Sequence, residues 1–198
     1  MKKILLLCFF VLFIFVNLSA QRVSWSFNGN YHTELESFGV GTQVILPVYK
    51  GLAFAPNITY YFEKELSYTS DSYLLYSEGH VKTKGIDYGL DVHYIFDLEE
   101  SDASISPFIG IAGTTLWHCS TGYNRSVGFL AGGGTSTSIN KFENRKSVTA
   151  AAFANIGIAG RWSFVNKFFI NTQAKYSIAT DEYWDSYFTL TAGVGYRF

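Results

Sequence analysis

The chain ends in FTLTAGVGYRF (residues 188–198), in which apolar residues alternate with small or polar ones. Alternation with a period of two is typical of a β-strand that has one apolar face. Here it continues to the terminal Phe198, whereas the last residues of a soluble domain usually fray. The pattern therefore predicts a final strand that is held by pairing with another strand.

The same alternation recurs along the chain and predicts eight strands in all. Its clearest example runs from Ile86 to Phe96, where Tyr88 and Leu90 alternate with polar residues and glycine. In residues 105–117 both sets of positions are largely apolar, so the facing of that strand stays open. The apolar positions of the other predicted strands are Val23, Trp25, Phe27; Val40, Thr42, Val44, Leu46; Leu52, Phe54, Ile58, Tyr60; Ile156, Ile158, Trp162, Phe164; and Phe168, Ile170, Ala174, Tyr176.

The connections between these strands alternate in length. Short joins at residues 48–51, 98–102 and 165–167 alternate with longer polar stretches. The polar stretches are residues 63–80, 119–146 and 181–186, and only the join at residues 34–37 is short on that side. Short turns at one end and long loops at the other predict an up-and-down antiparallel barrel with both termini at the short-turn end.

The aromatic content decides which face of the strands points outward. Aromatic residues make up 18% of the chain, and most of the rings in the predicted strands fall in the apolar set. We expect the interior of eight strands to be too narrow for that much ring volume. The opposite set is rich in Gly, Ser, Thr and Asn, so apolar-out and polar-in facing predicts a transmembrane β-barrel. A soluble, lipocalin-like barrel with the opposite facing is the alternative.

The N-terminus predicts export. Lys2 and Lys3 precede an apolar run over residues 4–16, and Ser19 and Ala20 form a small-residue cleavage site. We interpret residues 1–20 as a Sec signal peptide and residues 21–198 as the barrel domain. An N-terminal membrane anchor is the alternative, although the run is shorter than a membrane-spanning helix. After cleavage Cys119 is the only cysteine, so no intrachain disulfide is expected.

The chain resembles the small eight-stranded outer-membrane barrels of Gram-negative bacteria, of the OmpA/OmpX-like and PorT-like kind. The resemblance implies an outer-membrane location, periplasmic termini, and contact with outer-membrane lipid and lipopolysaccharide. In that family the barrel-assembly machinery recognises a last strand that ends in an aromatic residue. PorT-like barrels are tied to secretion and gliding machinery. The residues that match the assembly signal are Phe188, Leu190, Val194, Tyr196 and Phe198.

The alternation also predicts charged residues in the lumen. Charges enclosed in a narrow space must be paired, because an isolated buried charge is costly. We therefore expect an ion-pair network that fills the lumen. A gated or narrow pore, or a proton-sensitive site at His93, is the alternative. The predicted network consists of Asp87, Asp91, His93, Arg161, Lys175 and Arg197.

Two kinds of lipid A enzyme share this barrel size, and the sequence contains short stretches similar to the motifs of both. His118 and Ser120 have the His-x-Ser spacing of the deacylases, with Glu143 as a possible third member. His32 with Asp71-Ser72 could match the palmitoyltransferases. Both motifs are short and lack the surrounding family features, so we expect a protein that is not an enzyme. We also expect no cofactor and no nucleic-acid partner. No metal site is expected either, because the histidines lack the spacing of metal ligands.

The polar stretches near the long-loop end are rich in tyrosine. Tyrosine gives a large contact area at low entropic cost and is favoured on recognition surfaces. The alternative is an aromatic girdle at the membrane interface. The leading hypothesis is a barrel that serves envelope integrity or surface recognition, with an unknown surface ligand. The candidate recognition residues are Tyr68, Tyr73, Tyr76, Trp184 and Tyr187.

Overall fold

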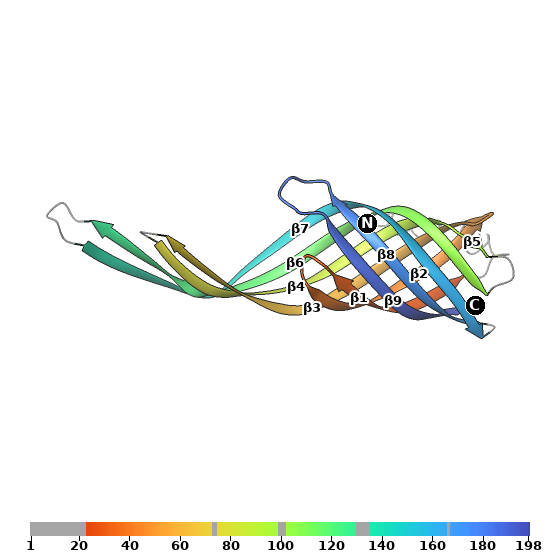
Figure 1. Ribbon diagram of the computed structural model, residues 1–198, viewed down its shortest axis with the longest axis horizontal. Helices are drawn as coiled ribbons and strands as arrows, with labels where there is room; N and C mark the ends of the chain where they lie inside the picture. The colour runs from red at the N-terminus through yellow and green to blue at the C-terminus, as the bar shows by residue number, and fades with distance from the viewer. Residues whose placement is uncertain (1–22, 73–74, 99–101, 130–134, 166) are drawn as a thin grey trace, which may run out of the picture.

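The computed structural model describes residues 23–72, 75–98, 102–129, 135–165 and 167–198. Its strands form one antiparallel sheet in the order β4-β3-β2-β1-β9-β8-β7-β6-β5, and pairing of β4 with β6 closes the ring. The two-residue β5 continues β4 beyond Ile95 along the same partner, β6. The ring therefore contains eight strands, and the predicted antiparallel barrel is confirmed (Figure 1). The predicted signal peptide and Tyr73 lie outside the described residues.

The strands have the following bounds: β1 (Ser24–His32), β2 (Ser37–Tyr49), β3 (Leu52–Ser72), β4 (Leu75–Tyr94), β5 (Phe96–Asp97), β6 (Ala103–Phe129), β7 (Thr135–Val165), β8 (Phe168–Ala179) and β9 (Tyr187–Arg197).

The ring closes between the first and last strands. β1 pairs with β9 from Ser24 opposite Arg197 to His32 opposite Thr189. The backbone N–H of Phe198 then donates to the carbonyl of Val23 at 2.9 Å. The prediction that pairing holds the end of the chain is confirmed.

Four of the strands are much longer than the others. β3, β4, β6 and β7 contain 20 to 31 residues, whereas β1, β2, β8 and β9 contain 9 to 13. The β2–β3 pairing ends at Gly39 opposite Tyr61, and the β7–β8 pairing ends at Phe153 opposite Ala179. Beyond these points the long strands continue as a four-stranded sheet that projects from one end of the barrel (Figure 1). We call this sheet the extension; it comprises residues 62–72, 75–84, 117–129 and 135–152.

The extension corrects part of the sequence prediction. Residues 63–80 and 119–146 were expected to be long loops, but nearly all of their described residues are paired strand. Both faces of the extension contain polar residues, so no apolar alternation marks these segments as strands.

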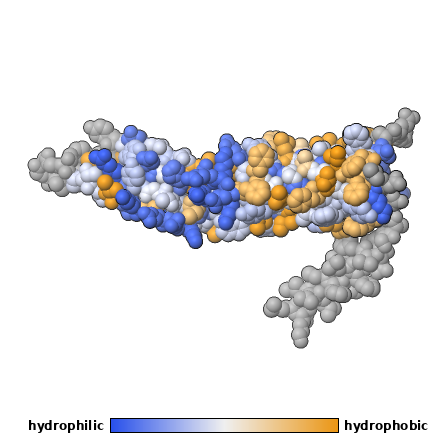
Figure 2. Space-filling view, turned by 90° about the horizontal axis from the view of Figure 1, so that it is seen from below, coloured by the Kyte–Doolittle hydropathy of each residue, from blue (hydrophilic) through white to orange (hydrophobic). Residues whose placement is uncertain are grey.

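The barrel has the predicted facing. Large apolar side chains such as Trp25, Tyr88 and Phe188 are exposed, while Ser26, Asn28 and Thr191 are buried inside. Figure 2 shows the hydrophobic residues gathered over the barrel and a mainly hydrophilic extension. The opposite facing of a soluble barrel is therefore wrong. In residues 105–117 the structure settles the open question: Ile105, Ile109 and Ile111 point outward, and Phe108, Ala112 and Leu116 point inward.

The lumen is less uniform than expected, because it contains large rings as well as small polar residues. Glycines make room for three of them: Gly39 lies directly opposite Tyr61, Gly157 opposite Phe108, and Gly195 opposite Phe169. A Cβ atom at any of these glycines would overlap the partner's ring. The rings of the predicted apolar set, such as Trp25, Tyr88 and Phe188, are exposed as expected, and the interior holds other rings in the space that glycine leaves. The buried inward rings are Tyr61, Phe108, Phe153, Phe169 and Tyr187.

Candidate functional site

The lumen end nearest the extension holds a cluster centred on Asp87, which is 2% exposed. Thr114 Oγ1 donates to Asp87 Oδ1 at 2.7 Å, and the Tyr187 hydroxyl donates to Asp87 Oδ2 at 3.3 Å. The His32 ring stacks on Tyr187 with centroids 3.8 Å apart and meets Tyr61 edge-on at 5.0 Å. Because the five residues come from β1, β3, β4, β6 and β9, their contacts tie separate walls of the barrel together.

Two of the candidate recognition residues belong to this cluster or cover it. Tyr187 was expected in a loop, but it lies in β9 and is 2% exposed. Trp184, in the connection between β8 and β9, packs edge-to-face on Phe153 at 6.0 Å. Phe153 in turn contacts Tyr187 at 5.0 Å. These rings close the lumen from the side of the extension.

The middle of the lumen is organised around Asp91, which is 1% exposed. Asn57 Nδ2 donates to Asp91 Oδ2 at 2.8 Å, and Asn155 Nδ2 donates to Asp91 Oδ1 at 3.1 Å. The hydroxyl of Ser177 donates to Asn155 Oδ1 at 3.0 Å. Lys175 is buried and attracts both Asp91 and Asp87 electrostatically, without an ion pair within 4.0 Å among the described residues.

The predicted lumen charges thus share the interior without the expected direct pairing. Within the described part of the chain, the ion pairs with N–O distances within 4.0 Å all lie outside the lumen. They join Lys64 to Glu36, His80 to Glu65, and Lys82 to both Glu63 and Glu65. Neutral amide and hydroxyl groups donate hydrogen bonds to the lumen carboxylates instead, because a buried carboxylate needs hydrogen-bond donors.

At the short-turn end the lumen charges are histidine and arginine. The His93 ring stacks on Phe108 with centroids 4.6 Å apart, and its Nδ1 shares a hydrogen bond with Ser106 Oγ at 3.1 Å. The guanidinium of Arg161 lies 4.6 Å from the centre of the Phe169 ring. Arg197 completes the set at the opening itself.

The outer face of the extension carries a second group of functional side chains. The hydroxyls of Tyr76 and Tyr123 both donate to Glu78 Oε2, at 2.9 and 3.0 Å. These hydrogen bonds raise the pKa of Tyr76 to about 12 and also raise the pKa of Tyr123. The two tyrosines line an open pocket of about 520 Å³ with Arg125, Ile139 and Lys141. Arg125 and Lys141 make no ion pair within 4.0 Å with another described residue.

The face of the extension that continues from the lumen has a different character. One row across its four strands reads Tyr68, Gly79, Gly122 and Phe142. The Tyr68 ring lies over Gly79 and the Phe142 ring over Gly122, so two aromatic rings cover the two central glycines. Farther from the barrel this face carries mainly small polar residues: Ser70, Ser77, Asn124 and Asn140, with Ser77 donating to Asn124 at 2.7 Å.

The two possible enzyme motifs are arranged differently from what their chemistry needs. His118 shares hydrogen bonds of 2.9 Å with Thr83 Oγ1 through Nδ1 and with Thr149 Oγ1 through Nε2. It therefore lies on the lumen-side face, whereas the deacylase arrangement requires a His and Ser that face lipid. Glu143 lies in β7 and is exposed.

The second motif is spread over the molecule. His32 is 2% exposed inside the barrel, beside Tyr61. Asp71 and Ser72 lie at the far end of the same strand as Tyr61, about ten residues or roughly 30 Å of extended chain away. The described residues also contain no group of three or more His, Cys, Asp or Glu that could hold a metal ion.

Comparison with known proteins places the fold. No family model and no curated protein matches the sequence. Among solved structures, a major outer membrane protein from Thermus thermophilus aligns with a TM-score of 0.56 at 10% identity, covering 90% of this chain and all of that one. The N-terminal β-barrel domain of Pseudomonas aeruginosa OprF aligns with a TM-score of 0.51 at 12% identity, over 90% of this chain and 98% of that one.

A third structure, Yersinia pestis Ail in complex with the heparin analogue sucrose octasulfate, aligns with a TM-score of 0.52. It is 12% identical and covers 90% of this chain and 97% of that one. Identities this low establish the fold alone. The predicted resemblance is confirmed at that level: the chain has the fold of the small bacterial outer-membrane β-barrels.

Proposed function

We propose that this protein is a non-enzymatic recognition protein of the bacterial outer membrane, in which the barrel is a closed anchor and the extension binds a partner outside the cell. The observation that carries the proposal is the extension itself. Four strands stay paired well beyond the barrel, so the recognition surface is a sheet with defined side-chain positions rather than a set of loops.

The surface chemistry supports the barrel as the membrane anchor and the extension as the binding element. Large apolar side chains encircle the barrel, as a lipid-facing band would, and the extension is mainly hydrophilic (Figure 2). The β1 and β9 ends meet at the short-turn end. In barrels of this kind short turns face the periplasm and long hairpins face outward. We therefore assign the extension to the cell exterior and the termini to the periplasm.

The extension has the features of a binding element. Its edge strands, residues 62–72 of β3 and 135–152 of β7, have no neighbouring strand on one side among the described residues. Free edges can add a strand from a partner, and tyrosines on a sheet surface favour recognition. Tyr76 and Tyr123 form the pocket that we expect to contribute most, together with Arg125 and Lys141, which have no ion pair within 4.0 Å to another described residue.

The lumen supports an anchor rather than a pore. Buried rings from β3, β6, β7, β8 and β9 occupy the interior, and eight strands leave no aqueous channel by size alone. Hydrogen bonds across the lumen further stabilise the closed ring.

The test removes the outer part of the extension and leaves the barrel strands unchanged. Leu66 lies directly opposite Val81, and Ser120 directly opposite Arg145, so an Asn-Gly turn can join each pair. Bacteria that display the intact protein or the shortened one are applied to an array of neutral, sialylated and sulfated glycans and to immobilised fibronectin and collagen. Heat-modifiable migration in gels checks that both proteins fold. Tyr76→Ala with Tyr123→Ala provides a finer variant with the extension intact.

We expect the intact protein to bind at least one of these surfaces and the shortened one to lose that binding, with unchanged detergent resistance of the cells. Equal binding by both proteins, or no binding above cells that lack the protein, contradicts recognition by the extension. Protease added to whole cells checks the orientation: cleavage within residues 63–80 or 119–146 is expected, and complete resistance in a surface-labelled protein contradicts it.

A further inference from the structure

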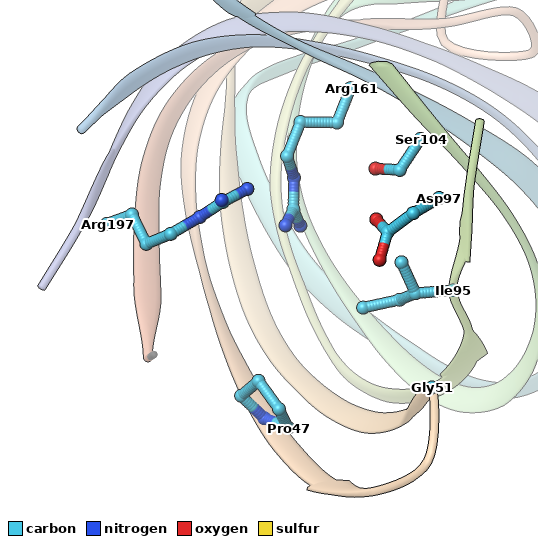
Figure 3. A pocket seen from close by; sticks show the side chains of 7 residues that line it. All are labelled: Pro47, Gly51, Ile95, Asp97, Ser104, Arg161 and Arg197. Carbon is cyan, nitrogen blue, oxygen red and sulfur yellow. The ribbon is translucent and has the colours of Figure 1, made fainter. Parts of the chain in front are cut away.

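The lumen opens at the short-turn end into a pocket of about 410 Å³, which we call the mouth. Arg161 of β7, Arg197 of β9 and Ser104 of β6 line its polar side together with Asp97 of β5. Figure 3 shows both guanidinium groups reaching into the pocket from different strands, with Asp97 and Ser104 facing them. The remaining lining residues are Pro47, Gly51 and Ile95.

The described residues compensate the charges of the two arginines only in part, since Asp97 attracts Arg161 from across the pocket. Neither has an ion pair within 4.0 Å to a described residue, although Asp97 lines the same pocket. Arg161 Nε is buried and has no hydrogen-bond partner. The ring of Phe169 offers Arg161 a cation–π contact, which compensates only part of the cost of desolvating a guanidinium.

The contrast with the acidic residues of the lumen is informative. Asp87 and Asp91 each accept two hydrogen bonds from neighbouring side chains. Among the described residues, neutral donors thus satisfy the two buried carboxylates, whereas Arg161 Nε has no acceptor. Arg161 and Arg197 repel each other, and Asp97, which attracts Arg161 from across the same pocket, forms no ion pair within 4.0 Å with either arginine, so the pocket can accommodate a further anion.

A further buried nitrogen without a hydrogen-bond partner lies just inside the mouth. His93 is 1% exposed, and its Nε2 has no hydrogen-bond partner, while Nδ1 is held by Ser106. His93 is close enough to Arg161 to interact with it electrostatically. Unsatisfied nitrogens from β4 and β7 thus gather at one end of the barrel.

We propose that the mouth binds an oxyanion, a carboxylate or a phosphate group, carried by a small molecule with a short apolar part. Planar guanidinium groups match such oxyanions with paired, charge-assisted hydrogen bonds. The Ser104 hydroxyl supplies a further donor, and Pro47 and Ile95 form an apolar wall for the rest of the molecule. Asp97 opposes the anion and therefore tunes its affinity. This site is separate from the extension and independent of the recognition role.

The experiment measures binding directly. The refolded full-length protein in neutral detergent micelles is titrated calorimetrically with sodium phosphate, acetate and butyrate at constant ionic strength. The variants are Arg161→Gln, Arg197→Gln and Asp97→Asn. Lys167→Gln is the matched control, because Lys167 is a cation at the same end of the barrel that lies over the Tyr196 ring outside the mouth. Circular dichroism and heat-modifiable migration confirm that each variant folds.

We expect saturable binding of phosphate or of the carboxylates. Each Arg→Gln change weakens it at least tenfold, in keeping with the loss of charge-assisted hydrogen bonds. Asp97→Asn strengthens it, and Lys167→Gln leaves it unchanged. Tighter binding of butyrate than acetate identifies a carboxylate with an apolar body, and preference for phosphate identifies a phosphoryl group.

The absence of saturable binding of all three anions overturns the proposal. So does binding that Lys167→Gln weakens as much as the arginine variants do, because that result indicates nonspecific attraction. If the mouth is the site, the protein with the shortened extension binds the same anions. The anion-binding result can therefore be interpreted even if the extension binds no partner.

Discussion

The ring of Phe169 lies over Gly195, its direct partner on the neighbouring strand of the barrel. The same relation joins Phe108 to Gly157 and Tyr61 to Gly39. In each pair the glycine leaves the volume that the ring fills. The packing of the lumen is therefore specified by cross-strand pairs and not by average side-chain size.

Gly195→Ala is expected to destabilise the barrel, because the new Cβ overlaps the Phe169 ring. Overpacking of this kind costs about 1–3 kcal/mol. Urea unfolding in lipid vesicles, followed by tryptophan fluorescence, measures the loss. Gly29→Ala is the control: its Cβ points outward and meets nothing closer than the Ala192 carbonyl at 3.8 Å. Equal stability of the two variants contradicts the pairing argument.

Tyr187→Phe is expected to lower the free energy of unfolding by about 1–3 kcal/mol, because it leaves Asp87 and Thr114 short of a buried partner. The same urea experiment measures the change. Tyr183→Phe, at a position that is 92% exposed, should have no effect. A double-mutant cycle with Thr114→Val should show strong coupling; additive losses indicate that the cluster does not act as a unit.

The intact protein is expected to show no unitary conductance steps in planar bilayers, because rings and hydrogen-bonded side chains occupy its lumen. Phe153→Ala combined with Tyr187→Ala removes two contacting rings and should produce small, reproducible steps. Tyr183→Ala serves as the control for handling and reconstitution. Steps of the intact protein at neutral pH favour the pore hypothesis over the anchor.

The Tyr76 hydroxyl is expected to titrate near pH 12, because it donates to Glu78. A raised pKa in the folded state means that this contribution to the stability of the extension is complete below about pH 10, the ordinary value of tyrosine, and disappears as the pH rises through about 12. Carbon-13 NMR of labelled tyrosine Cζ measures the midpoint. Glu78→Gln should lower it, and Glu65→Gln, on the same face, should not. A Tyr76 midpoint that Glu78→Gln leaves unchanged contradicts the view that the hydrogen bond to Glu78 raises this pKa.

The barrel could be predicted from sequence because lipid imposes a single pattern on it. Tyr88 and Leu90 must face the bilayer, and Asp87 and Asp91 must face inward, so the alternation is explicit. Where that constraint is weak, prediction fails. Residues 63–80 lie in the extension, whose faces both carry polar residues, and their strands have no hydropathy signature.

The candidate sites were harder to predict, because they depend on contacts between distant segments. The six lumen charges lie on the predicted side, yet Asp91 bonds to Asn57 and Asn155, which have no charge to mark them. Tyr187 begins a strand and closes the lumen, although it follows directly on a polar connection. Gly157 and Gly195 could have indicated the positions of the lumen rings. This inference requires knowledge of which residue lies opposite each glycine, and that register is not evident from the sequence. Cleavage after Ala20 stays a prediction, since those residues lie outside the described part of the chain.

Closure of the ring by β1 and β9 also separates the molecule into parts that can form at different times. The hairpins of the extension join segments that are close in the chain, such as Ser72 and Leu75. The pairing of Ser24 with Arg197 joins opposite ends of the domain, so its loop-closure entropy is the largest in the fold. Without the pairing of β1 with β9, the sheet would be open and would have two unpaired edges. We therefore expect the pairing of the last strand to remove two edges at which incomplete barrels would aggregate.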